Sequence, residues 1–182
     1  MRELSLHILD VVENSLAAGA KHVTIVIDEN LEADRLTITV TDDGHGMDEE
    51  TARRALDPFF TTRKTRHVGL GLPLFKAAAE RCNGRLIVES QPGQGTTVVA
   101  EFQHSHIDRA PLGDLPTTLL GIILSAKDVD VKYIHRVDGR QFELNTEEIR
   151  QALQGVPLSH PLAREWIRDY LIEGELSLRE NL

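Results

Sequence analysis

The sequence predicts an α+β fold: a two-layer α/β sandwich in which a mixed sheet carries helices on one face, with a small C-terminal α+β extension. Apolar residues recur at helical spacing in the opening segment, and the next apolar residues alternate with polar ones, as in half-buried strands. A second helical segment and two further alternating segments follow. We therefore divide the chain into a main domain, residues 1–103, and an extension, residues 104–182.

The opening helix is expected over residues 3–18. At about 100° per residue, its apolar side chains fall on one stripe that would be buried. The stripe consists of Leu4, Ile8, Val11 and Val12. Gly19 then supplies the left-handed conformation that commonly ends a helix. Strands are expected around residues 23–27 and 36–40, where Val, Ile and Leu alternate with polar residues.

The rest of the main domain contains two helices and two strands. Asp48 can cap a short helix that ends before Asp57, because the residue preceding a proline avoids the helical region. A longer helix opens near Leu72 and closes at Asn83, and proline at position 73 is tolerated in its first turn. The two strands, joined by a Pro-Gly turn, are expected at residues 85–90 and 96–103.

The extension begins with a segment that contains two prolines and a glycine and is typical of a linker. Asp138-Gly139 is a strong signal for a β-hairpin. Asn145 or Thr146 can cap the helix that follows, with Glu147 or Glu148 completing a capping box. The expected elements are a helix at residues 117–126, strands at 129–137 and 141–144, and helices at 146–153 and 162–172.

Composition excludes several classes of function. No apolar run approaches the ~20 residues needed to cross a bilayer, and the N-terminus lacks the apolar stretch of a secretory signal. Cys82 is the only cysteine, which excludes an internal disulfide and fits a reducing compartment. We therefore expect a cytoplasmic protein with no membrane partner. The net charge of −9 argues against a nucleic-acid partner.

The sequence contains one pair of histidines with the spacing of possible metal ligands. His104, His106 and Asp108 could form a metal-binding trio on an extended segment. We interpret the two histidines instead as surface or hydrogen-bonded residues, because no cysteine lies nearby and histidines at the end of a strand more often have that role.

Four short motifs occur in order within the first hundred residues. They are Glu-Asn-Ser at 13–15, Asp-Asp-Gly-His-Gly at 42–46, Asp-Pro-Phe-Phe-Thr-Thr-Arg at 57–63 and Gly-Leu-Gly-Leu at 69–72. Their order and distances resemble the N, G1, F and G2 boxes of the GHKL ATPase superfamily, which comprises DNA gyrase, heat-shock chaperones, histidine kinases and MutL-type mismatch-repair proteins. The resemblance covers residues 4–103 and implies a Bergerat-type fold that binds ATP and Mg²⁺.

The resemblance assigns the adenine and the metal to particular side chains. Asn14 would present a neutral oxygen to Mg²⁺, which prefers hard oxygen ligands. Asp42 would accept a hydrogen bond from the adenine amino group, a donor that guanine lacks at that position. The same resemblance places further residues at the nucleotide: Gly44, Gly46, Met47 and Thr96.

The phosphates would be held by the third and fourth motifs. A basic island at residues 63–66 interrupts the acidic trend of the chain, although such a short run can also be a solvated turn. The glycines at 69 and 71 precede a helix whose N-terminal amides can meet an anion, whereas neither the P-loop nor the dinucleotide pattern fits. Phe59 and Phe60 could be core residues or anchors of a lid, and we interpret them as structural. The phosphate residues implied are Thr61, Thr62, Arg63, Lys64, Gly69, Leu70, Gly71 and Leu72.

Asp10 is the expected catalytic base. It lies four residues before Asn14, where MutL-type and anti-sigma-kinase relatives carry a glutamate base, and it is shorter than glutamate by one methylene. Glu13 is nearer in sequence but points about 100° away from Asn14 on the helix. The alternative is that Asp10 only interacts with His7 on the helix surface.

These assignments predict an ATP-dependent kinase that acts on an unidentified protein partner, as stand-alone anti-sigma-type kinases of the superfamily do. The chain begins almost at the first motif, so a complete sensor kinase is not expected. The alternative is an ATP-gated switch or slow ATPase that binds a partner, or forms a homodimer, without phosphorylation. The N-terminal strand common in relatives is missing, and we expect the hairpin at residues 129–144 to replace it or to pack nearby.

Overall fold

The computed structural model describes residues 2–59 and 70–180. Its six strands form one mixed sheet in the order β3-β4-β2-β1-β5-β6. The strands are β1 (His22–Asn30), β2 (Arg35–Asp42), β3 (Arg85–Gln91), β4 (Gly95–Gln103), β5 (Asp130–Val137) and β6 (Arg140–Asn145). The helices are α1 (Leu4–Ala17), α2 (Glu49–Ala55), α3 (Gly71–Arg81), α4 (Leu115–Ser125), α5 (Thr146–Leu153) and α6 (Pro161–Ser177).

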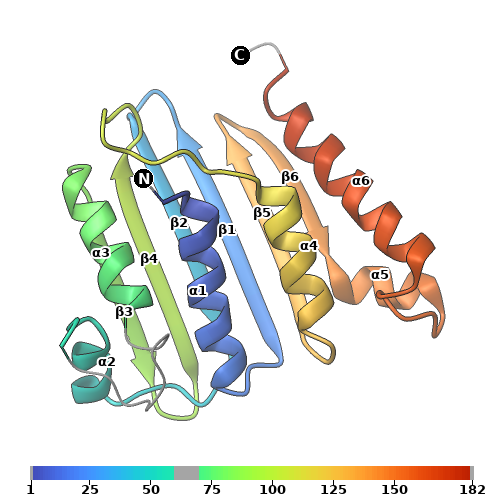
Figure 1. The fold of residues 1–182 in the computed structure, drawn as a ribbon, viewed down its shortest axis with the longest axis horizontal. Helices are drawn as coiled ribbons and strands as arrows, with labels where there is room; N and C mark the ends of the chain where they lie inside the picture. Colours follow the sequence, from blue (N-terminus) through green and yellow to red (C-terminus); the bar gives the residue numbers. More distant parts are fainter. Residues whose placement is uncertain (1, 60–69, 181–182) are drawn as a thin grey trace.

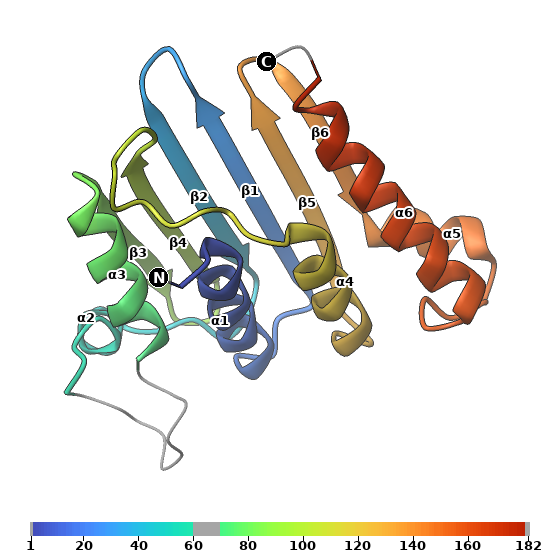
Figure 2. The same cartoon turned by 45° about the horizontal axis from the view of Figure 1, so that its top comes forward.

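The fold is the predicted α+β sandwich. Helices α3, α1, α4 and α6 lie side by side over one face of the sheet (Figures 1 and 2). Strand β1 pairs with β2 in the antiparallel sense and with β5 in the parallel sense, so the sheet is mixed as predicted. The C-terminal hairpin β5–β6 therefore extends the same sheet, so the prediction that it packs beside the strands of the main domain is confirmed. The proposed division at residue 103 crosses one continuous sheet and stays a prediction.

The hydrophobic core lies between the sheet and the helix layer. On β2 the side chains of Leu36, Ile38 and Val40 are buried, whereas the intervening threonines on the other face are only half-buried. Val12 of α1 is fully buried against this layer. Burying each such side chain contributes about 1.5–3 kcal/mol, so the alternating pattern fixes which face of the sheet the helices cover. No helix in the described part of the chain is long and apolar enough to span a bilayer.

Local caps explain where several helices begin. The Asp48 carboxylate accepts a hydrogen bond from the Thr51 N–H at 2.7 Å and starts α2, as predicted. Asn145 caps α5 in the same way. Helix α4 begins before the predicted residue 117 because Asp114 is its N-cap and accepts the Thr117 N–H at 3.1 Å.

Helix α6 continues past the predicted end at Ile172 as far as Ser177. Glycine at position 174 normally weakens a helix. Here it lies against the ring of Phe142 on β6, and a Cβ atom built on Gly174 would come within 2.1 Å of that ring. Close packing on the sheet thus keeps the helix going through a residue of low helical propensity.

A buried polar cluster anchors α6 to the sheet. We call it the Glu29 cluster; its members are Glu29, His104, Tyr133, His135, Glu175 and Arg179. His135 is fully buried, and its two ring nitrogens lie 2.6 Å from a Glu29 oxygen and 2.8 Å from a Glu175 oxygen. Because both partners are carboxylates, both nitrogens donate, and the imidazole carries a positive charge.

The other members complete the charge balance of the cluster. His104 lies 2.9 Å from Glu29, and the Arg179 guanidinium donates to the same carboxylate at 2.8 Å. The histidine interpretation made for His104 from the sequence is therefore confirmed: it is a hydrogen-bonded residue. Burial alone would raise the pKa of Glu29, but these hydrogen bonds and the Arg179 charge hold the pKa at about 2.

The Glu29 cluster makes stability depend on pH. Burial alone would lower the pKa of His135, but the hydrogen bonds to Glu175 and Glu29 raise the pKa above the ordinary value of 6.5. The contribution of His135 to stability is therefore fully present below that value and is lost as the pH rises through the folded-state pKa. We expect His135→Gln to lower the free energy of unfolding by about 3 kcal/mol at about pH 6 and by less at about pH 9.

Urea denaturation monitored by circular dichroism at both pH values measures this difference. His106→Gln, outside the cluster, is the matched control and should change stability by no more than about 0.5 kcal/mol at either pH. An equal loss for His135→Gln at both pH values would contradict the charged state assigned to His135.

Candidate functional site

Two hydrogen bonds hold the carboxylate of Asp42 at the end of β2. Its Oδ2 accepts the hydroxyl of Ser15 from α1 at 2.6 Å, and its Oδ1 accepts the N–H of Gly44 at 2.9 Å. Ser15 is buried, whereas Asp42 is only half-buried. A carboxylate can accept about four hydrogen bonds, so Asp42 keeps acceptor capacity for a ligand while its orientation is fixed from both sides.

The turn after β2 approaches neighbouring main chain closely enough to require glycine. Gly46 has a φ of +69°, and a Cβ there would lie 2.0 Å from the carbonyl oxygen of Gln91. Gly95, at the start of β4, has a φ of +92°, and a Cβ there would lie 2.0 Å from the carbonyl oxygen of Asp42. The β2 turn and the β3–β4 turn are therefore packed backbone to backbone beside Asp42.

Thr96 and Met47 lie in the same group of contacts, which we call the Asp42 cluster; its members are Ser15, Asp42, Gly44, Met47, Ser90 and Thr96. Thr96 is the register partner of Asp42 across the β2–β4 ladder. Its hydroxyl lies 2.8 Å from that of Ser90, and the Ser90 Oγ accepts the N–H of Met47 at 2.8 Å. Ser90 belongs to none of the four motifs and was not predicted, although the turn between β3 and β4 places residues 90 and 96 opposite each other.

Asn14 lies beside the Ser15–Asp42 contact, because it precedes Ser15 on α1. The residue is half-buried, and its main-chain carbonyl accepts the N–H of Ala18. The main chain of Ala18 in turn accepts the N–H of His45 at 2.8 Å. The end of α1 and the β2 turn are thus joined by main-chain and side-chain bonds within one short stretch that contains Asn14.

Asp10 lies one turn before Asn14 and faces α3. A Cβ built on Gly71, the first residue of α3, would lie 3.2 Å from the Cβ of Asp10. The structure therefore brings together the expected base and the start of the helix that is expected to meet the phosphates. Leu70 precedes this helix and caps it with no side-chain hydrogen bond, which leaves the first amides to other partners. The side chain of Leu72 is buried in the core, so only its main chain is available to a ligand, and its assignment to the phosphates stays a prediction.

The suggested contact between Asp10 and His7 is wrong. Asp10 pairs with the guanidinium of Arg2 at 2.7 Å. His7 instead is buried and stacks on Phe75 of α3, with ring centroids 5.0 Å apart. Burial, followed by the charges of Arg2 and Arg81, lowers the pKa of His7 to about 4, so the stacked ring is neutral at physiological pH.

The third motif can be placed only in part. Thr61, Thr62, Arg63, Lys64 and Gly69, expected at the phosphates, lie outside the described residues, as do Phe60 and Arg66. Phe59 is 95% exposed, so its interpretation as a structural residue is wrong. Helix α2 ends at Ala55, and the chain that follows it runs away from the sheet (Figure 2).

An open hollow of about 890 Å³ adjoins the Asp42 cluster on the side of α2. Three members of the Asp42 cluster, Asp42, Ser90 and Thr96, line this hollow. Arg53 and Asp48 line its α2 side. Such a volume accommodates a small molecule. Asn14 does not line this hollow, so the hollow adjoins the site at Asp42 but does not extend to α1.

Comparison with known proteins assigns the first part of the chain to a family. The sequence model described as histidine kinase-, DNA gyrase B-, and HSP90-like ATPase matches residues 2–106. The chain is 35% identical over 97 residues to the heme sensor protein HssS of Staphylococcus saprophyticus and 42% identical over 89 residues to the sensor protein kinase FleS of Pseudomonas aeruginosa. It is 31% identical over 88 residues to sporulation kinase C of Bacillus subtilis.

These matches are partial. They cover 53%, 49% and 48% of this chain, respectively, but only 20%, 22% and 20% of the relatives. The chain is also similar to a solved structure, the N-terminal domain of a DNA repair protein, with a TM-score of 0.55 at 16% identity. That match covers 80% of this chain and 53% of the other, and at this identity it shows the fold alone.

The packing at Asp42 predicts that alanine substitution destabilises the protein by different amounts at two glycines of the β3–β4 turn, Gly93 and Gly95. Gly95→Ala adds a Cβ that overlaps the Asp42 carbonyl, whereas at Gly93, with a φ of +78°, no described atom lies within 4 Å of the added Cβ. We expect Gly93→Ala to cost about 1–2 kcal/mol of stability from backbone strain alone. Gly95→Ala should cost at least about 3 kcal/mol, since overlap adds to the strain.

Chemical denaturation of the two variants and the wild type gives both costs. Equal destabilisation by the two substitutions would show that the β2 and β3–β4 turns are not packed against each other as described.

Proposed function

The chain belongs to the histidine kinase-, DNA gyrase B-, and HSP90-like ATPase family and carries its ATP-binding domain, and on that premise we propose that it uses Mg-ATP to phosphorylate a partner protein. The observation that carries the proposal is the Asp42 carboxylate, fixed at the end of β2 by Ser15 and Gly44. A fixed acceptor selects a ligand that offers a donor, and the adenine amino group is such a donor.

Asn14 is the proposed ligand of the Mg²⁺ that accompanies the nucleotide. Its support is its position: it is half-buried, one residue from Ser15 and one helical turn from Asp10. An amide oxygen is a hard ligand of the type Mg²⁺ accepts, and the metal would supply charge neutralisation at the phosphates. Gly71 and the start of α3 would contribute N–H donors to the same phosphates, together with Thr61–Lys64 and Gly69 from the undescribed segment.

Asp10 is the proposed base that receives a proton from the phosphate acceptor. Its ion pair with Arg2 is partly exposed, with 25% of the Asp10 and 37% of the Arg2 side chain accessible. Exposed pairs of this kind contribute at most about 1 kcal/mol, so the pair can open at little cost when a substrate arrives. Arg2 then remains beside the proposed phosphate-binding helix as a positive charge.

A second function has one observation in its favour. The extension is joined to the ATPase sheet by the β1–β5 pairing and by the Glu29 cluster, and it is not attached merely by a linker. A nucleotide-dependent change in the sheet could therefore reach α6 directly. In that case the protein is an ATP-gated switch, or a slow ATPase, whose extension binds a partner protein or a second copy of the chain.

Labelled phosphate distinguishes the two functions. The protein is incubated with Mg²⁺ and γ-labelled ATP, with and without candidate partner proteins, and label on protein is compared with free phosphate. Transfer of label to a partner supports the kinase. Release of phosphate alone, or ATP-dependent dimerisation measured by light scattering, supports the switch and contradicts the kinase.

Two substitutions on α1 test the roles proposed there. We expect Asn14→Ala to abolish Mg²⁺-dependent ATP affinity in calorimetry, because the metal ligand is lost. Asp10→Asn should leave that affinity unchanged and lower turnover by on the order of 100-fold or more, the usual contribution of a general base.

Glu13→Gln is the matched control, because Glu13 is exposed and adjoins Asn14 on another face of the helix. It should alter neither binding nor turnover. If Asp10→Asn turns over at the wild-type rate, Asp10 is not the base; if Glu13→Gln stops turnover instead, the base is Glu13.

A further inference from the structure

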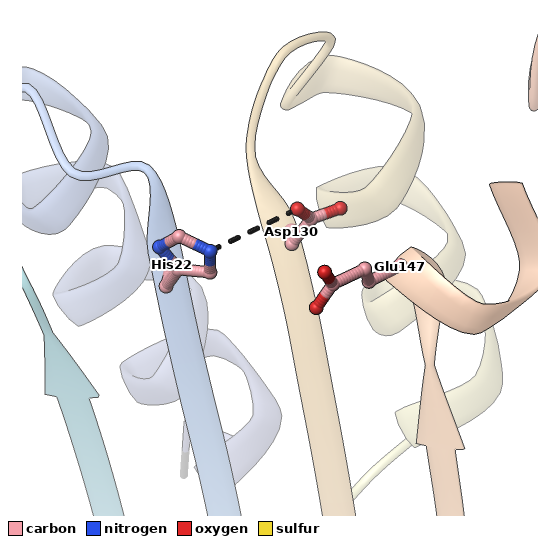
Figure 3. A group of neighbouring side chains, drawn as sticks. All are labelled: His22, Asp130 and Glu147. Carbon is pink, nitrogen blue, oxygen red and sulfur yellow. Dashed lines mark ion pairs between the residues drawn. The ribbon is translucent and has the colours of Figure 1, made fainter. Parts of the chain in front are cut away.

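Three side chains outside the nucleotide site converge at one edge of the sheet. His22 stands at the start of β1, Asp130 at the start of β5, and Glu147 in the first turn of α5 (Figure 3). One ligand atom from each lies within 4.8 Å of the others. His22 Nε2 is 3.9 Å from Asp130 Oδ2. We propose that His22, Asp130 and Glu147 form a binding site for a divalent transition-metal ion of the Zn²⁺ type.

The spacing suits such an ion. Zn²⁺ binds imidazole nitrogen and carboxylate oxygen at about 2.0–2.2 Å, which places neighbouring ligand atoms of a tetrahedral site about 3.4 Å apart. The separation of 3.9 Å between His22 and Asp130 is close to that value, and small side-chain rotations would close the rest. A third ligand from Glu147 leaves the fourth position to water. Imidazole also distinguishes the site from an all-oxygen Mg²⁺ site.

The histidine is already oriented as metal-binding histidines are. His22 Nδ1 lies 2.8 Å from Asp43 Oδ2, so this nitrogen carries the hydrogen and donates it to the carboxylate. The same carboxylate accepts the main-chain N–H groups of Lys21 and His22 through its Oδ1, at 2.7 and 2.9 Å. Asp43 is thus fixed in turn, and Nε2 faces Asp130. A carboxylate behind the imidazole is the usual support of a metal-bound histidine.

Asp130 supplies a second, independent observation. Its Oδ1 is buried from solvent and has no hydrogen-bond partner among residues 2–59 and 70–180. The nearest cation, Arg150 Nη1, is 3.7 Å away, and the other Arg150 nitrogen donates to the Val129 carbonyl at 3.1 Å. Oδ1 thus has an ion-pair neighbour but no hydrogen-bond donor among the described residues, whereas Oδ2, 3.9 Å from His22 Nε2, is the oxygen directed at the proposed metal. A bound cation would compensate the charge of this partly buried carboxylate.

The local charge also favours a cation. Three carboxylates, those of Asp43, Asp130 and Glu147, surround the imidazole, and Arg150 offsets one of them. The hydrogen bond to Asp43 raises the pKa of His22, so a proton competes with the metal for Nε2. Binding experiments therefore belong at about pH 8, where the competing proton is released more readily.

A metal at this position would join the extension to the turn after β2. Glu147 and Asp130 belong to the extension, His22 begins the strand that follows α1, and Asp43 is the neighbour of Asp42. None of the three ligands belongs to the proposed nucleotide site, so the metal site does not depend on the proposed function.

Cobalt provides the direct test. The full-length, nucleotide-free protein is treated with chelator, exchanged into buffer at about pH 8 and titrated with Co²⁺, whose visible absorption reports coordination. Zn²⁺ and then Mg²⁺ are added as competitors. We expect saturation at one equivalent, displacement by Zn²⁺ and no displacement by a large excess of Mg²⁺. Saturation at no defined stoichiometry, or displacement by Mg²⁺ as readily as by Zn²⁺, overturns the proposal.

Matched variants locate the bound ion. Glu147→Gln and Asp130→Asn should each weaken Co²⁺ binding at least about tenfold and change its visible spectrum. Glu148→Gln, the exposed neighbour on the same turn, should bind as the wild type does. Circular dichroism verifies that each variant is folded. Unchanged binding by Glu147→Gln, or an equal loss in Glu148→Gln, places the ion elsewhere and overturns the proposal.

Discussion

The hydrogen bond from Ser15 to Asp42 is the constraint on which the site depends. It joins the buried face of α1 to the end of the central strand β2, and at 2.6 Å with a charged acceptor it contributes about 1.5–3 kcal/mol. Asn14 is carried by the same helical turn, and Asp10 by the turn before it. One contact therefore sets the position of the proposed metal ligand, the proposed base and the proposed adenine acceptor relative to each other. The glycine turns behind Asp42 give its carboxylate a rigid support.

The extension is joined to the ATPase sheet by strand pairing and by buried polar contacts. Its strand β5 pairs with β1 along the length of that strand, and the Glu29 cluster ties α6 to the ends of β1 and β5. At the opposite end of β1, His22 lies between Asp43 and Asp130. Strand β1 is thus linked to the extension at both ends. A rearrangement of the turn after β2 would therefore be transmitted to the extension through packed side chains and paired strands. Such coupling is compatible with either proposed function.

Periodicity and capping predicted most of the fold, because the elements of this chain obey local rules. The stripe on α1, the alternation on β1 and β2 and the Asp48 cap all lie within a few residues of the structure they specify. The rest depended on contacts between distant residues. The alternative that pairs His7 with Asp10 on the helix surface fails because His7 stacks on Phe75 of the distant helix α3. Glu29 is buried only because His135 and Arg179, far along the chain, pack against it. The site motifs gave residue types, whereas the roles of Ser15, Ser90 and Arg2 emerged only from strand register and helix position.

Both proposed functions rest on the role of Asp42 as a fixed acceptor for the amino group of adenine. Calorimetric titration of the wild-type protein with Mg-ATP and with Mg-GTP tests it most directly, because the two nucleotides share their phosphates and differ in the donor presented at that position. If Asp42 is that acceptor, ATP binds saturably and GTP binds at least about 100-fold more weakly. Equal affinity for both nucleotides, or no binding of ATP, would contradict it.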